Sequence, residues 1–219
     1  DAERKISIIA EIKKASPSAG EIVKNYDPLN IAKIYIENKA SFLSVLTEED
    51  FFLGSLNHVE KIKNKYKIPI LCKDFFLDPY QVPLAKSFGA DCILIIMSAV
   101  EKELAKDIYQ AANDLNISTL IEVHSEAEAE SALNFENALI GINNRNLDNL
   151  EVSLDTSIKL SKILHPHKNP LICESGIQSP KDIKFIIQNA KIYNFLVGES
   201  LLKSHDIGSK LKQFTQISL

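Results

Sequence analysis

Six charged side chains occupy the same kind of position in the sequence, at or just after the end of a short apolar run. In the first run, residues 8–12, a β-strand would place Glu11 on the same face as Lys13, because residues two apart in a strand point the same way. A carboxylate beside an ammonium group can serve as base and acid in one reaction. The other four charged residues follow later runs and are Lys73, Glu122, Arg145 and Glu174.

Apolar runs of strand length recur eight times, with helix-like segments between them. After the first, the runs cover residues 42–46, 68–72, 91–97, 119–123, 138–142, 170–173 and 195–197. The helix-like segments cover residues 29–38, 56–65, 79–88, 101–115, 125–133, 155–164, 180–189 and 207–214. Strand followed by helix, eight times over, predicts an α/β fold, a (β/α)8 TIM barrel with residues 1–219 as one domain. An open doubly wound sheet is the alternative, but it more often has fewer strands and a glycine-rich first turn, which is absent here.

Composition narrows the classes of function. The net charge of -4 and the scattered lysines argue against a nucleic-acid partner, since a binding face needs clustered basic residues. The sequence has neither an apolar run long enough to span a bilayer nor a signal-peptide pattern, so we expect a cytoplasmic protein without a membrane partner. The odd count of cysteines, all in predicted strands, favours reduced thiols at Cys72, Cys92 and Cys173.

The barrel interpretation brings the six charged residues together. Active sites of such barrels lie at the carboxyl ends of the strands, so one mouth would gather three carboxylates and three cations. Ion pairs that merely close the barrel are the structural alternative. Burying six charges is costly without a functional role, so we favour an active site.

Two glycine-containing turns after the last two strands predict a phosphate site. Ser175-Gly176 precedes a helix that Ser179 and Pro180 would start, and Gly198-Glu199 follows the eighth strand. Backbone N–H groups of these two loops form the usual phosphate cradle of a barrel. The predicted ligand is a small molecule that carries a phosphate monoester.

A metal site at Glu122 and His124 is not favoured. The two would share a strand face, but no further His, Cys or Asp pair completes a set of ligands, so we expect no metal. The acidic residues of the next helix, Glu126, Glu128 and Glu130, predict an exposed face.

From residue 6 to residue 212 the chain resembles indole-3-glycerol phosphate synthase, a (β/α)8 enzyme of tryptophan biosynthesis. The resemblance rests on several motifs taken together, since Glu-Ser-Gly alone would be weak. They are Glu11-Ile-Lys13-Lys-Ala-Ser16-Pro-Ser, Leu46-Thr-Glu-Glu-Asp-Phe-Phe52-Leu-Gly-Ser, Pro69-Ile-Leu-Cys-Lys73-Asp-Phe75, Asp78-Pro-Tyr-Gln, Gly89-Ala-Asp, Ile121-Glu122-Val-His, Gly141-Ile-Asn143-Asn-Arg145-Asn-Leu, Glu174-Ser-Gly-Ile and Val197-Gly-Glu-Ser-Leu.

The resemblance implies a lyase reaction without cofactor or metal on 1-(2-carboxyphenylamino)-1-deoxyribulose 5-phosphate. The ring carbon that carries the carboxylate attacks the ribulose carbonyl, and carbon dioxide and then water leave. By family position Lys73 is the general acid, Glu122 a base in the dehydration, and Glu11 and Lys13 the adjacent acid–base pair. The phosphate contacts would be Lys13, Ser175, Gly176, Gly198 and Glu199. Ser16, Asn143, Arg145 and Glu174 would hold the substrate carboxylate or orient the site, and Phe52 and Phe75 would line the slot for the aromatic ring.

Two further expectations follow from these roles. A lysine that acts as an acid works best with a pKa near neutrality, and we expect Lys13 and Arg145 to lower the pKa of Lys73. The resemblance also implies an extra helix before the first strand that covers the barrel mouth, whereas only five residues precede Ile6 here, so either the chain is a trimmed or incomplete form or the protein has lost this helix. We therefore expect weaker substrate binding.

Two rival functions and the mode of assembly stay open. One rival is a barrel like phosphoribosylanthranilate isomerase, which would share the phosphate turns but would not need Lys13 and Lys73 together. The other is a degenerate barrel without catalysis, against which the intact charged residues argue. The expected assembly is a monomer or part of a fused or associated tryptophan-pathway enzyme.

Overall fold

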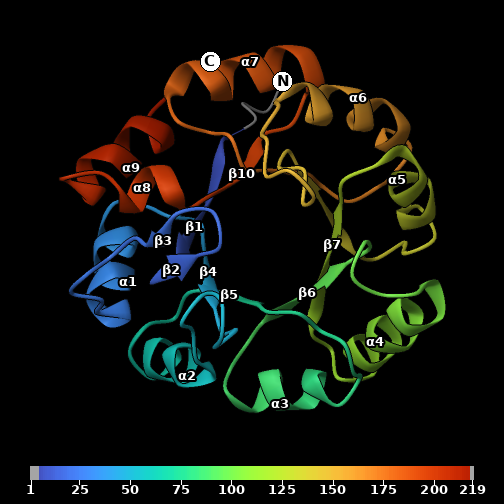
Figure 1. Cartoon of the computed structure of the whole chain (residues 1–219), viewed down its shortest axis with the longest axis horizontal. Helices are drawn as coiled ribbons and strands as arrows, with labels where there is room; N and C mark the ends of the chain where they lie inside the picture. The colour runs from blue at the N-terminus through green and yellow to red at the C-terminus, as the bar shows by residue number, and fades with distance from the viewer. Residues whose placement is uncertain (1–4, 218–219) are drawn as a thin grey trace.

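The computed structural model describes residues 5–217 and contains a closed, all-parallel barrel of eight strands (Figure 1). Around the barrel the strands pair in the order β1-β10-β9-β8-β7-β6-β5-β4, and β4 closes on β1. Their bounds are β1 Ser7–Ile12, β4 Phe42–Leu46, β5 Ile70–Lys73, β6 Cys92–Ile96, β7 Ser118–Val123, β8 Leu139–Asn143, β9 Leu171–Glu174 and β10 Asn194–Val197. The predicted barrel is confirmed, and each predicted strand lies within two residues of its place.

Helices surround the barrel, as Figure 1 shows. They are α1 Pro28–Glu37, α2 Leu56–Lys65, α3 Gln81–Ser87, α4 Lys102–Asp114, α5 Glu126–Ala132, α6 Asp155–Leu164, α7 Pro180–Ala190, α8 Glu199–Leu202 and α9 Ile207–Thr215. Side-chain caps fix several starts: Asp27, Ser55, Ser125 and Asp206 each accept a backbone N–H of the first helical turn. Between residues 5 and 217 every helix is too short or too polar to cross a bilayer.

Alternation along the strands divides the apolar residues between two cores. Outward residues such as Ile8, Val45 and Ile121 pack against the helices in the larger core. The inward residues form a small core inside the barrel, made of Ile9, Leu71, Leu94, Leu120, Ile172 and Leu196. This apolar layer lies directly beneath the site, and the next inward residue along a strand, one step closer to the mouth, belongs to the floor of the site.

Four of the predicted site residues form that next layer. Glu11, Lys73, Glu122 and Glu174 come from β1, β5, β7 and β9, which are alternate strands around the barrel. Layers of four side chains from alternate strands are the usual filling of such barrels. Here the layer is charged instead of apolar, and the three carboxylates are at most 5% exposed.

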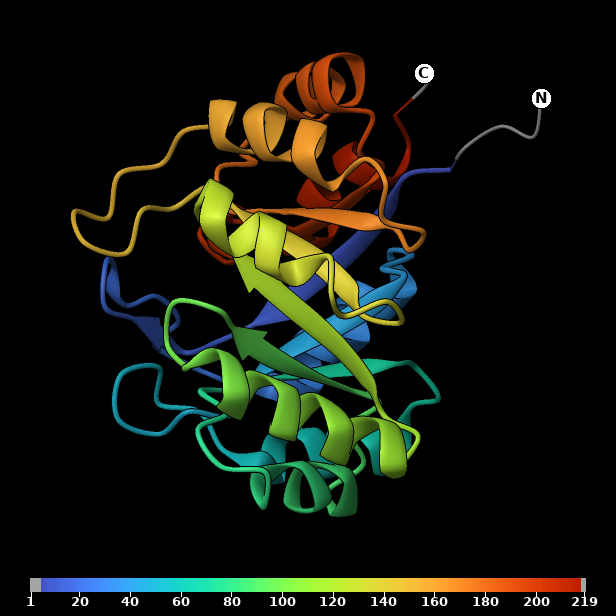
Figure 2. The same ribbon diagram turned by 90° about the vertical axis from the view of Figure 1, so that its right-hand side faces the viewer.

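The loops after the strands extend from one end of the barrel. Figure 2 shows the loops that follow β1, β4 and β8 projecting beyond the arrowheads at the same side. The first of them holds a small antiparallel hairpin, β2 Ala15–Ser16 with β3 Gly20–Glu21, which the sequence did not predict. It folds the Ser-Pro-Ser segment back over the mouth and buries Ser16.

Candidate active site

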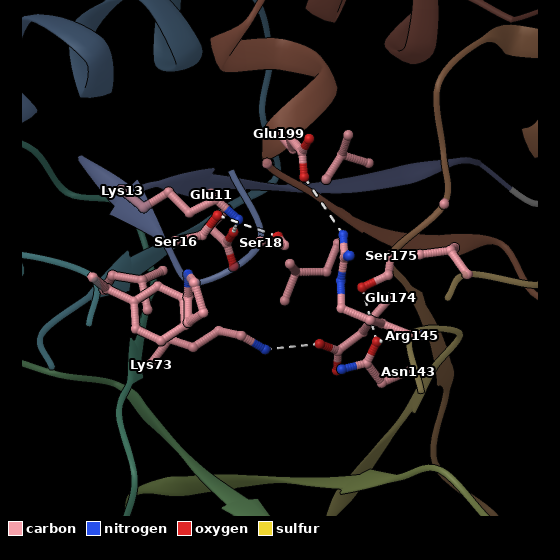
Figure 3. Close-up of a pocket in the computed structure, with 18 of the residues that line it drawn as sticks. Glu11, Lys13, Ser16, Ser18, Lys73, Asn143, Arg145, Glu174, Ser175 and Glu199 are labelled. Carbon is pink, nitrogen blue, oxygen red and sulfur yellow. Dashed lines mark hydrogen bonds and ion pairs between the residues drawn. The ribbon is translucent and has the colours of Figure 1, made fainter. Parts of the chain in front are cut away.

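A cavity of about 930 Å³ opens at the carboxyl ends of the strands (Figure 3). Every predicted site residue lines it: Glu11, Lys13, Ser16, Phe52, Lys73, Phe75, Glu122, Asn143, Arg145, Glu174, Ser175, Gly176, Gly198 and Glu199. The residues taken from the ends of the strands and those implied by the family resemblance thus lie around one cavity.

Lys73 is the central cation of the cavity floor. Its Nζ lies 2.9 Å from Glu122 Oε2 and 2.8 Å from Glu174 Oε2, so two carboxylates from β7 and β9 share one ammonium group. Figure 3 shows the Lys73 side chain reaching across the barrel to Glu174. All three groups are largely buried, so the ammonium group carries much of the compensation for two acidic side chains.

The two carboxylates differ in their remaining partners. Glu122 Oε1 accepts a hydrogen bond of 2.9 Å from Asn143 Nδ2 and lies 3.2 Å from His124 Nε2. Within residues 5–217, Glu174 Oε1 has no hydrogen-bond partner. It lies against Gly141, where an added Cβ would overlap it.

These surroundings drive the two pKa values apart. Burial alone would raise the pKa of Glu122, but Lys73, His124 and Asn143 outweigh it and hold this pKa well below its usual range. Burial together with the neighbouring Glu122 raises the pKa of Glu174 to about 8, although Lys73 opposes the change. At neutral pH the two carboxyl groups that share Lys73 are therefore one ionised, Glu122, and one largely protonated, Glu174.

The expected lowering of the Lys73 pKa is wrong. Burial does act to lower it, but the carboxylates of Glu122, Glu174 and Glu11 outweigh burial, and the pKa of Lys73 is raised. Neither of the two cations expected to lower this pKa is among its causes. Each has an acidic partner of its own: Lys13 Nζ lies 2.6 Å from Glu11 Oε1, and Arg145 Nη2 lies 3.5 Å from Glu199 Oε2. Lys73 is thus a permanently charged group at neutral pH.

The predicted pair of Glu11 and Lys13 is confirmed as an ion pair at the end of β1, which lies next to β10 and β4. Gly198 leaves room for it, because a Cβ at this position would overlap the Glu11 carboxylate and lie 3.0 Å from its Cβ. The absence of a side chain at Gly198 thus lets the last strand approach the pair closely.

The predicted phosphate loops lie at the same side of the mouth. Ser175 and Gly176 both have positive φ, 62° and 87°, and Ser175 Oγ donates a hydrogen bond of 2.8 Å to Asn143 Oδ1. Gly198 and Glu199 begin α8. Two lysines that the sequence analysis missed, Lys203 and Lys210, also line this part of the cavity.

The negative charge of Glu199 is balanced by two cations in this region. Lys203 Nζ lies 2.6 Å from its Oε1, and Arg145 contacts its other oxygen, as Figure 3 shows. The bond from Lys203 comes first among the causes that lower the pKa of Glu199. The spacing of four residues between Glu199 and Lys203 on a helix was the signal that could have revealed this pair.

Apolar side chains form the outer walls. Phe52 and Phe75 line the cavity from the loops after β4 and β5, and Leu147, Leu150 and Val152 line it from the loop after β8. The cavity thus joins a charged floor, an apolar slot and a basic corner. Such a combination suits an aromatic substrate that carries two anionic groups.

Outside the cavity, one expectation about the acidic helix is wrong. Glu126 and Glu130 are exposed, but Glu128 is not. Its Oε2 accepts a hydrogen bond of 2.9 Å from the His124 backbone N–H and lies 3.3 Å from His124 Nδ1.

The described residues 5–217 hold no group of three His, Cys, Asp or Glu side chains that could bind a metal ion. The three cysteines are free thiols, as predicted.

Comparison with known proteins gives one consistent result. Residues 1–214 match the family model described as indole-3-glycerol phosphate synthase. The chain is 43% identical over 209 residues to the indole-3-glycerol phosphate synthase of Polaromonas naphthalenivorans, covering 95% of this chain and 79% of that protein. It is 41% identical over 212 residues to the one of Carboxydothermus hydrogenoformans, covering 97% and 80%. Among solved structures, 3-hexulose-6-phosphate synthase from Salmonella typhimurium has a TM-score of 0.77 at 13% identity, covering 96% and 97%, and shares the fold.

Proposed function

Because the chain belongs to the indole-3-glycerol phosphate synthase family, we propose that it converts 1-(2-carboxyphenylamino)-1-deoxyribulose 5-phosphate to indole-3-glycerol phosphate. The observation that carries this proposal is the floor of the cavity. One lysine lies between two buried carboxylates of different protonation, and a second acid–base pair lies beside them. Ring closure, decarboxylation and dehydration need several proton transfers in one place, and this floor supplies the groups for them.

Lys73 serves the ring closure. As the ring carbon attacks the ribulose carbonyl, negative charge grows on the carbonyl oxygen. The buried ammonium group of Lys73 stabilises that charge and donates a proton to it, leaving a hydroxyl group. Its raised pKa ensures that the proton is present at neutral pH, and the forming alkoxide is basic enough to take it. Loss of carbon dioxide then restores the aromatic ring.

Glu122 serves the dehydration. Its depressed pKa leaves a carboxylate that can remove a proton from the carbon between the amine and the former carbonyl. The hydroxyl group leaves as water and needs a proton in turn. Because Lys73 has given up its proton in the ring closure, Lys13 and the protonated Glu174 are the groups that can supply it.

The two anionic ends of the substrate are held by two groups of residues that meet at Arg145. The loops with Ser175-Gly176 and Gly198-Glu199, together with Lys13, bind the phosphate, and Lys203 and Arg145 balance the Glu199 carboxylate there. Ser16, Asn143 and Arg145 lie where they can bind or orient the carboxylate of the anthranilate ring. Phe52 and Phe75 hold that ring. Fixing both ends folds the flexible chain so that the ring carbon meets the carbonyl.

The direct test is incubation of the purified protein with the carboxyphenylamino substrate while indole fluorescence and carbon dioxide are measured. The proposal predicts that the indole product and carbon dioxide form in equal amounts. Conversion of phosphoribosylanthranilate without release of carbon dioxide would instead support the isomerase alternative. Absence of both reactions in a folded protein would support a barrel without catalysis. A Lys13→Met variant is a useful comparison, because the isomerase reaction does not require Lys13 and Lys73 together.

A further inference from the structure

Glu122 and Glu174 have nearly equivalent positions relative to Lys73, and something must decide which of them is ionised. Their distances to Nζ differ by only 0.1 Å, 2.9 against 2.8 Å, and both side chains are buried. Two carboxylates around a single ammonium group do not both keep a full charge in a buried site without further compensation. A second cation near one of them would settle the assignment.

His124 is placed to be that cation. It follows β7 directly, and its Nε2, which makes no hydrogen bond within residues 5–217, lies 3.2 Å from Glu122 Oε1, whereas Lys73 contacts Oε2 of the same carboxylate. It does not line the main cavity, so it reaches the substrate only through Glu122. Its side chain is only 10% exposed, so its charge is poorly screened by solvent.

Glu128 holds the other nitrogen of the imidazole, Nδ1. The Oε2 of Glu128 accepts the His124 backbone N–H at 2.9 Å and lies 3.3 Å from Nδ1, while Ser125 Oγ donates 2.8 Å to the other oxygen. Ser125 also caps α5, so the carboxylate is tied to the first turn of that helix. The imidazole thus lies between two carboxylates, one from each side.

The charge of this group is consistent with its surroundings. Burial acts to lower the pKa of His124, but Glu122 and Glu128 outweigh it and raise the pKa to about 9. A second cavity of about 680 Å³ adjoins His124 and Glu128, and its remaining charged lining residues are Arg145, Asp148 and Glu151. Two of these three are acidic, so the cavity does not oppose a positive imidazole.

We propose that His124, held by Glu128, is a positioning residue that keeps the Glu122 carboxylate ionised and oriented as the base. The inference deepens the proposed function, because it takes Glu122 as the base of that reaction. It explains why the proton of the carboxylate pair resides on Glu174, which lacks such a neighbour within residues 5–217. It also gives a role to Glu128, the one glutamate of α5 that is not exposed.

The test uses three variants of the full chain. His124→Asn keeps a polar side chain but removes the charge, and Glu128→Gln keeps the acceptor for the backbone N–H but removes the charge behind the imidazole. His167→Asn is the matched control. His167 lies between α6 and β9, is partly buried and contacts the Phe135 carbonyl, and it lines neither cavity. Circular dichroism checks that each variant is folded.

In kinetics we expect His124→Asn to lower kcat about 10-fold or more, while KM changes by less than about threefold. The acidic limb of the kcat profile, where Glu122 takes up its proton, should move to higher pH by about one unit, since loss of a nearby cation raises a carboxyl pKa. Glu128→Gln should move the limb in the same direction by less, and His167→Asn should not move it. A loss of kcat with an unmoved limb would overturn the proposal, since that pattern indicates a purely structural role.

A second measurement is independent of the reaction. In the ligand-free protein, ¹H–¹⁵N correlations of the imidazole ring should show both His124 nitrogens protonated at pH 7.5, and Glu128→Gln should lower the titration midpoint. A neutral imidazole at that pH in the wild-type protein would overturn the proposal. If the wild-type protein fails to convert the substrate, the proposed function fails, but this titration still decides the charge state of His124. If His124→Asn does not fold, Glu128→Gln carries both tests.

Discussion

Glu122 and Glu174 approach one ammonium group from neighbouring parts of the barrel, yet within residues 5–217 only Glu122 has a hydrogen-bond donor at its second oxygen. Asn143 donates to that oxygen and His124 lies beside it, whereas the second oxygen of Glu174 has no hydrogen-bond partner among residues 5–217. The same ion-pair geometry therefore yields one ionised and one protonated carboxyl group. This division of an acid and a base between two similar residues is a recurring feature of enzyme sites.

The protonated Glu174 should leave a signature in the stability of the protein. Its pKa rises from the ordinary 4.5 to about 8 on folding, so the folded protein holds its proton more tightly than the unfolded chain. The stability that this proton provides is complete below about pH 4.5 and is lost as the pH rises through about 8. Glu174→Gln removes the titration, so the Tm of the wild type should fall relative to that of the variant between pH 6 and 9.

The control for that comparison is Glu199→Gln. Glu199 has a lowered pKa and lies at the rim of the same cavity, so its removal should not change the slope of Tm against pH in this window. If the Tm curves of the wild type and Glu174→Gln run parallel from pH 6 to 9, the proton is not on Glu174.

Lys73→Ala should abolish turnover and also weaken the fold. Loss of the general acid should lower kcat by about 10²-fold or more. The substitution also leaves Glu122 and Glu174 without their shared cation, which should cost about 3 kcal/mol or more of unfolding free energy at neutral pH. Acid should recover part of that stability, because protonation removes the uncompensated charge.

Denaturant unfolding at pH 5 and pH 8 together with steady-state kinetics measures both effects. Lys63→Ala is the matched control. Lys63 Nζ lies 2.8 Å from Asp91 Oδ2, and neither residue lines the cavity, so this substitution should change neither turnover nor the pH dependence strongly. A variant that retains more than about a tenth of wild-type turnover would remove Lys73 from the role of acid.

Strand alternation was enough to predict which side chains enter the barrel mouth. Glu11, Lys13, Lys73 and Glu122 all lie where the period of two placed them, because the barrel fixes the inward face of each strand. The sign of the Lys73 pKa shift could not be predicted in the same way. It depends on which groups meet across the barrel, and that is set by the stagger of eight strands, not by spacing along the chain.

The role of Glu128 was missed for a related reason. An alternation of glutamate and alanine on a helix indicates an exposed face, but the first turn of α5 follows β7 so closely that one carboxylate reaches back to His124. The hairpin of β2 and β3 was missed because strands of two residues have no periodicity to detect.

Gly141→Ala should damage the site through Glu174. An added Cβ would overlap Glu174 Oε1 and lie 3.3 Å from Leu120 Cδ1. The backbone at Gly141 is central in β8, so the carboxylate must move away, and overpacking of this kind typically costs about 1–3 kcal/mol. A double-mutant cycle with Glu174→Ala checks the cause: the two losses of unfolding free energy should be clearly less than additive. Full additivity would show that the glycine acts on something other than that carboxylate.

Inorganic phosphate should bind at the basic corner of the cavity and stabilise the protein. The corner combines the loops of Ser175-Gly176 and Gly198-Glu199 with the side chains of Lys13 and Lys203. A ligand that binds only the folded state raises the unfolding free energy by about 1.4 kcal/mol at a concentration ten times its Kd. Tm should therefore rise with phosphate at constant ionic strength, and phosphate should inhibit turnover by competition with the substrate.

Lys203→Ala tests whether this effect arises at the proposed corner. The variant frees one oxygen of Glu199, which then repels the anion, so both the rise in Tm and the competitive inhibition should weaken. Lys162→Ala, an exposed lysine in the last turn of α6, should leave both unchanged. Because salt can stabilise proteins without a specific site, a chloride series at matched ionic strength is the baseline. An equal rise in Tm in chloride, or an equal response of the two lysine variants, would mean that the corner is not a phosphate site.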